Sequence, residues 1–191
     1  ALFLGGIWQM LKEEKVPLKE AAEQVARVCR RLAMLHLAFA KTLVAEFGEE
    51  KGKQIVLKAI KQYGISIGKE VKAKANALGL SLEPENYVED LPHYGMHESM
   101  EKLEIDGEPR IIARGCVMGK YWNEMGMGEL GRLYCFVDVA KYMAFNPDYK
   151  LVHLKALPDG DEYCEFAIRL TTEQEKKDFF DEDKDWRYID R

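Results

Sequence analysis

The chain has 191 residues, of which 47% are hydrophobic and 32% are charged, and its formal net charge is −5. A chain of this length can bury a full hydrophobic core, and we expect one domain spanning residues 1–191. The acidic balance argues against a nucleic-acid partner, because nucleic-acid-binding domains are typically basic.

Residues 1–8 are apolar but too few to span a bilayer, and they lack the charged leader of a signal peptide. The four cysteines, at positions 29, 116, 135 and 164, form no CxxC pair. We therefore expect reduced thiols in a cytoplasmic protein without a membrane partner.

Two long helices are predicted in the first half of the chain. Apolar residues recur every three or four positions from Leu18 to Phe47, and again from about Glu50 to Leu78. Gly64 and Gly68 lie one turn apart in the second helix, so that either another backbone approaches closely there or the helix breaks at Gly64. These helices form the helical part of the domain, residues 18–79. One hypothesis is that two copies of the chain form a homodimer through them.

After residue 100 the hydrophobic pattern changes to that of short strands, and it predicts an α+β fold in which two long helices precede a small antiparallel sheet with one inserted helix. This part, residues 100–170, is expected to carry the site. The segment 181–191 is expected to be a poorly ordered tail, although Trp186 and Tyr188 could pin it to the body. The expected elements are a hairpin of Lys102–Ile105 and Arg110–Val117, a helix from Glu129 to Phe145, a hairpin of Tyr149–Ala156 and Tyr163–Leu170, and a last helix from Thr171 or Thr172 to Phe180.

Asp138 is the strongest candidate for a catalytic side chain. It follows Cys135 by three residues, so both side chains point to the same face of the predicted helix. That face is otherwise apolar, and a buried carboxylate is costly without a partner. Two roles are open: Asp138 braces the neighbouring hairpin through backbone amides, or it acts as a general acid/base.

Three cysteines fall in the same predicted subdomain, and three interpretations of them are open. Cys116, Cys135 and Cys164 could be buried thiols that serve as small apolar residues. Alternatively, Cys135 or Cys164 attacks a substrate while Asp138 transfers the proton. A third reading is a zinc site formed by all three, although zinc sites usually contain a short-spaced ligand pair.

The candidate substrate-binding residues are scattered along the second half of the chain. Trp122, beside the glycine-rich link at 126–131, could line an apolar pocket. Arg132 and Asn146 could recognise a substrate carboxylate, Arg132 through a bidentate fork. Two histidines in the irregular segment 81–99 are either exposed loop residues or part of a lid over the pocket; they are His93 and His97. His36 and His153 are expected to be structural.

Several short blocks together resemble the family of L-2-amino-thiazoline-4-carboxylic acid hydrolases. The resemblance covers roughly residues 30–170, and it implies a hydrolase that opens a small cyclic amidine or thiazoline without a cofactor. The last hairpin is also similar to 4-vinyl-reductase-type ligand-binding domains, some of which hold zinc through cysteines. That similarity implies the alternative of a non-catalytic small-molecule-binding or sensor domain with a structural zinc. The blocks are residues 45–52, Tyr63-Gly64 with Gly68, Leu130-Gly131 through Tyr134-Cys135 to Asp138, Phe145-Asn146-Pro147, and Gly160-Asp161 with Cys164 and Phe166.

Overall fold

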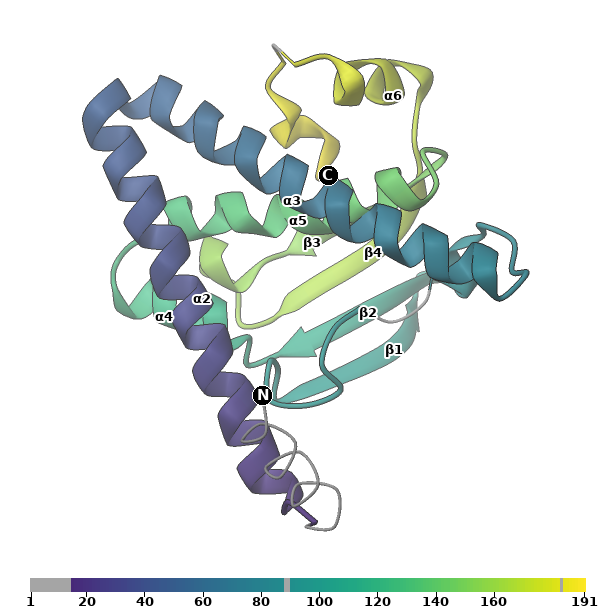
Figure 1. Cartoon of the computed structure of the whole chain (residues 1–191), viewed down its shortest axis with the longest axis horizontal. Coiled ribbons are helices and arrows are strands. Elements are labelled where there is room, and N and C mark those ends of the chain that lie inside the picture. Colours follow the sequence, from purple (N-terminus) through teal and green to yellow (C-terminus); the bar gives the residue numbers. More distant parts are fainter. Residues whose placement is uncertain (1–14, 88–89, 183) are drawn as a thin grey trace, which may run out of the picture.

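The computed structural model describes residues 15–87, 90–182 and 184–191, so the apolar residues 1–8 lie outside the described part. Two long helices open the fold, α2 (Leu18–Phe47) and α3 (Glu49–Ala77) (Figure 1). The prediction of both helices is confirmed to within one residue at each end. Gly48, at φ 82°, reverses the chain between them, and this conformation favours glycine.

Gly64 and Gly68 lie where α3 crosses α5 (Gly128–Phe145). The helix is continuous through both, and a Cβ at Gly64 would stand 2.6 Å from Ala140 Cβ and 2.8 Å from the Val137 carbonyl oxygen. The glycines therefore allow close approach of α3 to α5, and the alternative of a break at Gly64 is wrong. Because α5 of the same chain covers this face, a homodimer would have to use another part of the N-terminal helices, and it stays a prediction.

Four antiparallel strands form one sheet in the order β1-β2-β4-β3. The α+β class is thereby confirmed. The β1-β2 hairpin turns at Asp106 and Gly107, both with positive φ. The register of β3 against β4 shifts between His153 and Lys155, next to the candidate site. The strands are β1 (Ser99–Ile105), β2 (Glu108–Arg114), β3 (Tyr149–Lys155) and β4 (Cys164–Leu170).

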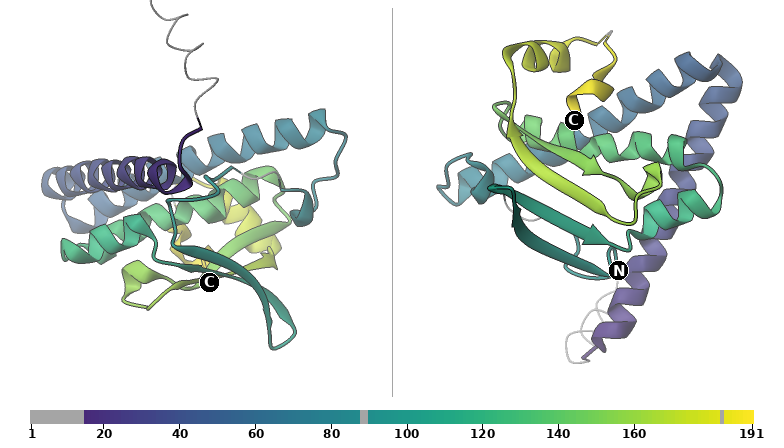
Figure 2. Two further views of the ribbon diagram at one scale, coloured as in Figure 1. Left: turned by 90° about the horizontal axis from the view of Figure 1, so that it is seen from below. Right: turned by 180° about the vertical axis from the view of Figure 1, so that it is seen from behind.

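Helix α5 lies between α3 and the sheet, as the view from below shows (Figure 2). It is buried along most of its length, including Val139 and Ala140, which are fully buried. Polar side chains in the middle of α5, such as Asp138 and Lys141, therefore face mainly protein rather than solvent.

A short helix, α4 (Val117–Glu124), was not expected from the sequence. Strand β2 ends at Arg114, Gly115 turns the chain at φ 64°, and Cys116 is the N-cap of α4 instead of a strand residue. The glycine-rich run is not a flexible link, because Gly128 already begins α5 and Gly131 packs against the Trp122 ring.

The C-terminal residues are folded, in contrast to the expected tail. Thr172 and Glu175 form a capping box at the start of α6 (Glu173–Phe180), and the 3₁₀ helix η3 (Trp186–Ile189) follows. Trp186 is only 1% exposed, and its indole N–H donates to the Asp178 carbonyl oxygen at 2.8 Å. The Lys61 ammonium lies 3.8 Å from the centre of the Trp186 ring. Trp186 thus pins this segment to α3 and α5. No helix in the described part of the chain combines the length and hydropathy that a membrane span requires.

Candidate functional site

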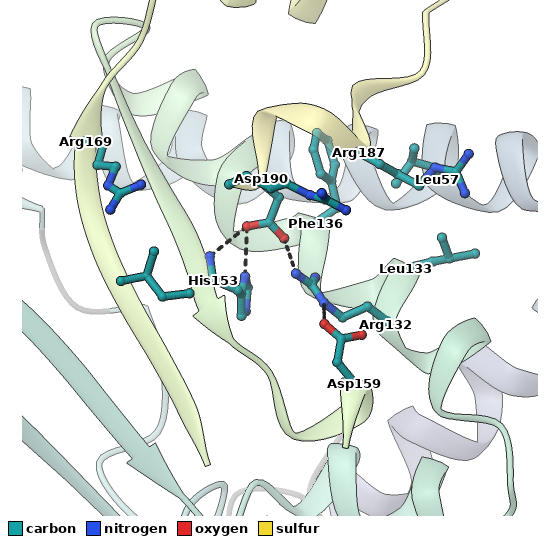
Figure 3. A pocket seen from close by; sticks show the side chains of 11 residues that line it. Leu57, Arg132, Leu133, Phe136, His153, Asp159, Arg169, Arg187 and Asp190 are labelled. Atoms are coloured by element: carbon teal, nitrogen blue, oxygen red, sulfur yellow. Dashed lines mark hydrogen bonds and ion pairs between the residues drawn. The ribbon is translucent and has the colours of Figure 1, made fainter. Parts of the chain in front are cut away.

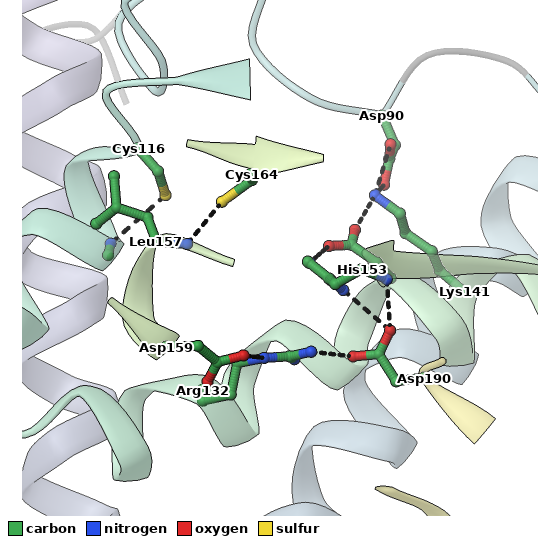
Figure 4. A network of polar contacts seen from close by, with 11 residues as sticks. Asp90, Cys116, Arg132, Lys141, His153, Leu157, Asp159, Cys164 and Asp190 are labelled. Carbon is green, nitrogen blue, oxygen red and sulfur yellow. Dashed lines mark hydrogen bonds and ion pairs between the residues drawn. The ribbon is translucent and has the colours of Figure 1, made fainter. Parts of the chain in front are cut away.

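A line of charged side chains crosses the interior between α5 and the sheet (Figure 4). It begins on α5, where Lys141 Nζ lies 2.9 Å from Asp138 Oδ1 and 3.4 Å from Asp90 Oδ2. Burial alone would lower the pKa of Lys141, but the two carboxylates outweigh it and raise that pKa above its ordinary value. Lys141 is therefore a charged lysine in the interior, compensated by two acidic side chains.

His153, from β3, continues the line between two carboxylates. Its Nε2 lies 3.5 Å from Asp138 Oδ2, and its Nδ1 lies 3.0 Å from Asp190 Oδ1. The backbone N–H of His153 donates to the same oxygen of Asp190 at 2.8 Å. The imidazole is 2% exposed and packs against the Phe166 ring, so its orientation is fixed on all sides.

At the far end of the line, Arg132 joins Asp190 to Asp159. Its Nη2 lies 2.8 Å from Asp190 Oδ2, and its Nε donates to Asp159 Oδ2 at 2.9 Å. Burial opposes the ionised form of Asp190, but His153 and Arg132 outweigh it and hold the pKa of this carboxyl below its usual value.

This end of the line forms the wall of an open cleft of about 540 Å³ (Figure 3). Arg132 and Asp159 border it, whereas the Asp190 side chain is only 5% exposed. The lining residues are Leu57, Arg132, Leu133, Phe136, His153, Leu154, Asp159, Arg169, Arg187, Asp190 and Arg191.

Asp138, at the centre of the line, keeps 18% of its side chain exposed. His97, from the loop before β1, is half-buried near this carboxylate. Burial lowers the pKa of His97 more strongly than the neighbouring Asp138 raises it, so its imidazole is neutral at pH 7. The structure thus brings the predicted residues Asp138 and His97 together, whereas His93 lies on the exposed part of the same loop.

The three cysteines lie near Asp138 and are free thiols. Burial raises the pKa of Cys164 to about 12, and the pKa values of Cys116 and Cys135 are also raised by burial. Cys164 Sγ accepts from the Leu157 backbone N–H at 3.4 Å, and Cys116 Sγ accepts from Gly119 at 3.5 Å. These surroundings do not favour the thiolate that nucleophilic attack requires.

No three His, Cys, Asp or Glu side chains among residues 15–87, 90–182 and 184–191 are placed to hold a metal ion. The zinc set of Cys116, Cys135 and Cys164 is therefore not preassembled in the described part of the chain.

Two of the predicted substrate-binding residues have structural contacts. Trp122 is 1% exposed, and its indole N–H donates to the Ala33 carbonyl oxygen at 3.2 Å, which ties α4 to α2. The Asn146 amide donates to the Leu82 carbonyl oxygen at 2.9 Å and accepts from the Asp148 backbone N–H at 3.0 Å. Arg132 is held by Asp190 and Asp159, so it does not reach Asp138.

Sequence reasoning predicted Asp138 and Arg132 as site residues and missed the other five members of the line, among them Lys141, His153 and Asp190. Lys141 carries a readable signal, because it follows Asp138 by three residues on a helix with few other charges. His153 stands in a strand in which its neighbours Leu151 and Val152 are also buried, and this pattern gives no sign of a functional role. Asp190 comes from a segment that was expected to be a tail.

Taken together, the fold and this line of charges define an α+β protein with a buried Asp–His–Asp assembly beneath a half-buried loop. A family model described as L-2-amino-thiazoline-4-carboxylic acid hydrolase matches residues 26–168, and the chain belongs to that family. The match includes Arg132, Asp138 and His153, whereas Asp190 lies beyond it.

No curated protein matches the sequence. Among solved structures, the chain is similar to a trafficking protein particle complex subunit 3 from Naegleria fowleri, whose crystal structure has palmitic acid covalently bound. The two are 12% identical with a TM-score of 0.47, over 75% of this chain and 95% of that chain. This likeness is too loose to bear on function.

Proposed function

We propose that this protein is a hydrolase that opens a small cyclic amidine of the 2-amino-thiazoline-4-carboxylate type, with Asp138 as its general base. The supporting observation is Asp138 itself, a partly exposed carboxylate that Lys141 compensates at 2.9 Å and that lies 3.5 Å from the imidazole of His153. The family name supports hydrolysis as the reaction class.

The chemistry that this geometry supports is a direct attack by water. Asp138 removes a proton from water as the water oxygen bonds to the amidine carbon, and the electron pair of the C=N bond moves to nitrogen. His153 Nε2 can take up that proton from Asp138. The oxygen then forms C=O and gives up its hydroxyl proton as the ring bond from this carbon to sulfur or nitrogen breaks, and the electron pair of that bond stays on the heteroatom. The stored proton and the hydroxyl proton go to the nitrogen that received the C=N electron pair and to the departing heteroatom. One water is added and no other reactant is needed.

Charge favours the same site for an amidine substrate. A protonated amidine is a cation, and Asp138 and Asp90 lie on either side of the single ammonium of Lys141. We assign Cys135 and Cys164 no covalent step, because burial raises both thiol pKa values. Arg132, expected to bind the substrate carboxylate, instead supports the assembly from the side of the cleft.

The test is ring opening of 2-amino-thiazoline-4-carboxylate, followed by proton NMR with the purified protein. We expect turnover by the wild type and a loss of about 10- to 100-fold in His153→Gln, because proton storage is removed. His36→Gln is the matched control, since His36 is also a buried histidine but bonds to the Leu130 carbonyl oxygen outside the line. Full activity of His153→Gln would contradict the mechanism.

A second candidate function is a non-catalytic small-molecule-binding domain. The raised pKa values of the buried thiols favour it, because a binding module needs no reactive cysteine. Calorimetric binding of the same compound without ring opening would support this function over the hydrolase.

A further inference from the structure

We propose that Asp190, outside the region that the family model matches, is a positioning residue that sets the tautomer of His153 for the reaction at Asp138. The inference rests on the proposed function, and it concerns a side chain that touches no substrate. Its basis is the arrangement of three donors around one buried carboxylate.

The Asp190 carboxylate dictates where the proton of His153 resides. An ionised carboxylate can only accept, so at 3.0 Å from Asp190 Oδ1 the Nδ1 atom of His153 must carry hydrogen. Neutral His153 is then left with a bare Nε2, 3.5 Å from Asp138 Oδ2. Only in this tautomer can His153 take a proton from Asp138, because the other tautomer would present an N–H to that carboxylate.

Two further contacts keep the Asp190 carboxylate from turning. The backbone N–H of His153 also donates to Oδ1, and Arg132 holds Oδ2 at 2.8 Å. Both oxygens are thus occupied by groups from β3 and α5, and the carboxylate plane is fixed relative to the imidazole. Asp190 thus accepts from one ring nitrogen and orients the other, as carboxylates do for histidines that bind metal ions.

The C-terminal segment is anchored firmly enough for this role. Trp186 and Ile189 are buried against α3 and α5, in a cluster that includes Leu57, Phe136 and Phe179. The Tyr188 hydroxyl donates to Asp178 at 2.8 Å, which ties η3 back to α6. Residues 186–190 therefore complete the site from outside the family's matched region.

The first test needs no substrate. The tautomer of His153 is determined by ¹⁵N NMR at a pH at which the ring is neutral, and the His153 signals are identified by their absence in His153→Gln. We expect Nδ1–H in the wild type. In Asp190→Ala we expect Nε2–H, because Asp138 becomes the remaining acceptor. Nε2–H in the wild type, or an unchanged tautomer in Asp190→Ala, would overturn the inference. If Asp190→Ala does not fold, the wild-type spectrum alone still decides.

The second test uses turnover of 2-amino-thiazoline-4-carboxylate. We expect kcat of Asp190→Ala to fall about 10- to 100-fold with KM within about threefold, and Asp190→Asn, which keeps an acceptor oxygen, to recover both the Nδ1–H tautomer and most of kcat. Asp178→Asn is the control, since Asp178 is a buried carboxylate of the preceding helix α6 whose side chain accepts from Gln174 and Tyr188, and the asparagine keeps an acceptor oxygen. A restored tautomer without restored kcat would contradict the positioning role. A wild type that does not open the ring would refute the proposed function, while the NMR result would still decide the tautomer.

Discussion

The charged line and the three thiols lie side by side in the interior, and they differ in how the protein balances their charge. Asp138 has the ammonium of Lys141 and the imidazole of His153 within 3.5 Å. Cys116 and Cys164 have backbone N–H groups instead, those of Gly119 at 3.5 Å and Leu157 at 3.4 Å. Burial costs a charged group much more than a neutral one, so the interior supplies counter-ions for the carboxylate and keeps the thiols protonated. The comparison supports our proposal that Asp138, and not a thiol, is the reactive group.

The largest effect on turnover is expected from Asp138→Asn. This change keeps the shape of the side chain but removes the base, so kcat should fall by about 10²- to 10⁴-fold. Ring opening is the measurement, and chemical denaturation reports whether the variant still unfolds cooperatively. A variant that loses its native fold would mark Asp138 as a structural brace of β3 instead.

Removal of the counter-ion tests the charge balance directly. Lys141→Met leaves Asp138 and Asp90 without their shared ammonium, and we expect a loss of about 3–5 kcal/mol in the free energy of unfolding. Lys120→Met is the control, because its pair with Glu98 is exposed and should contribute about 0–1 kcal/mol. Equal losses in the two variants would show that the interior does not depend on Lys141.

Acid titration tests the far end of the line. Because the folded-state pKa of Asp190 lies below its unfolded value of about 3.9, its stabilising effect is present above that pH and disappears as the pH falls through the folded-state pKa. Between pH 5 and pH 2 the wild type should therefore lose more unfolding free energy than Asp190→Asn, by roughly 1.4 kcal/mol for each unit of pKa depression. Parallel stability curves would show that His153 and Arg132 do not hold the Asp190 charge.

The sequence predicted the elements whose signals are local. Both long helices follow from hydrophobic periodicity with a proline before the first and a glycine after each, and both hairpins follow from alternation around Asp-Gly turns. Helix α4 was missed because it has only eight residues and follows Gly115, which ends β2. The C-terminal segment was misjudged because Trp186 and Ile189 are buried by packing on α3 and α5, which are distant in sequence.

Only part of the site could be predicted from the sequence, because the other part depends on contacts between elements that are distant in sequence. Asp138 stood out because an acidic residue on an apolar helix face needs a partner, but that partner, Lys141, was overlooked although it follows by three residues. His153 and Asp190 come from β3 and η3, and their pairing depends on how these elements stack on α5. Trp122 and Asn146 were predicted to bind substrate because of their residue type. Residue type does not distinguish a binding surface from a core contact or a turn.

The smallest expected effect on turnover is that of substituting the thiols, and it tests whether they take part in the reaction. At pH 8 a thiol of pKa about 12 is ionised in roughly one molecule in ten thousand, so Cys164 should react with alkylating reagents about 1,000-fold more slowly than a thiol of ordinary pKa 9. Cys135→Ala and Cys164→Ala should each keep kcat within about threefold, because the attacking group is water and Asp138 retains Lys141 and His153. Mass spectrometry of alkylated peptides identifies the reacting cysteine. Rapid modification of Cys135 together with lost turnover in Cys135→Ala would show that the thiol, and not Asp138, is the reactive group. Burial would then not keep that sulfur protonated.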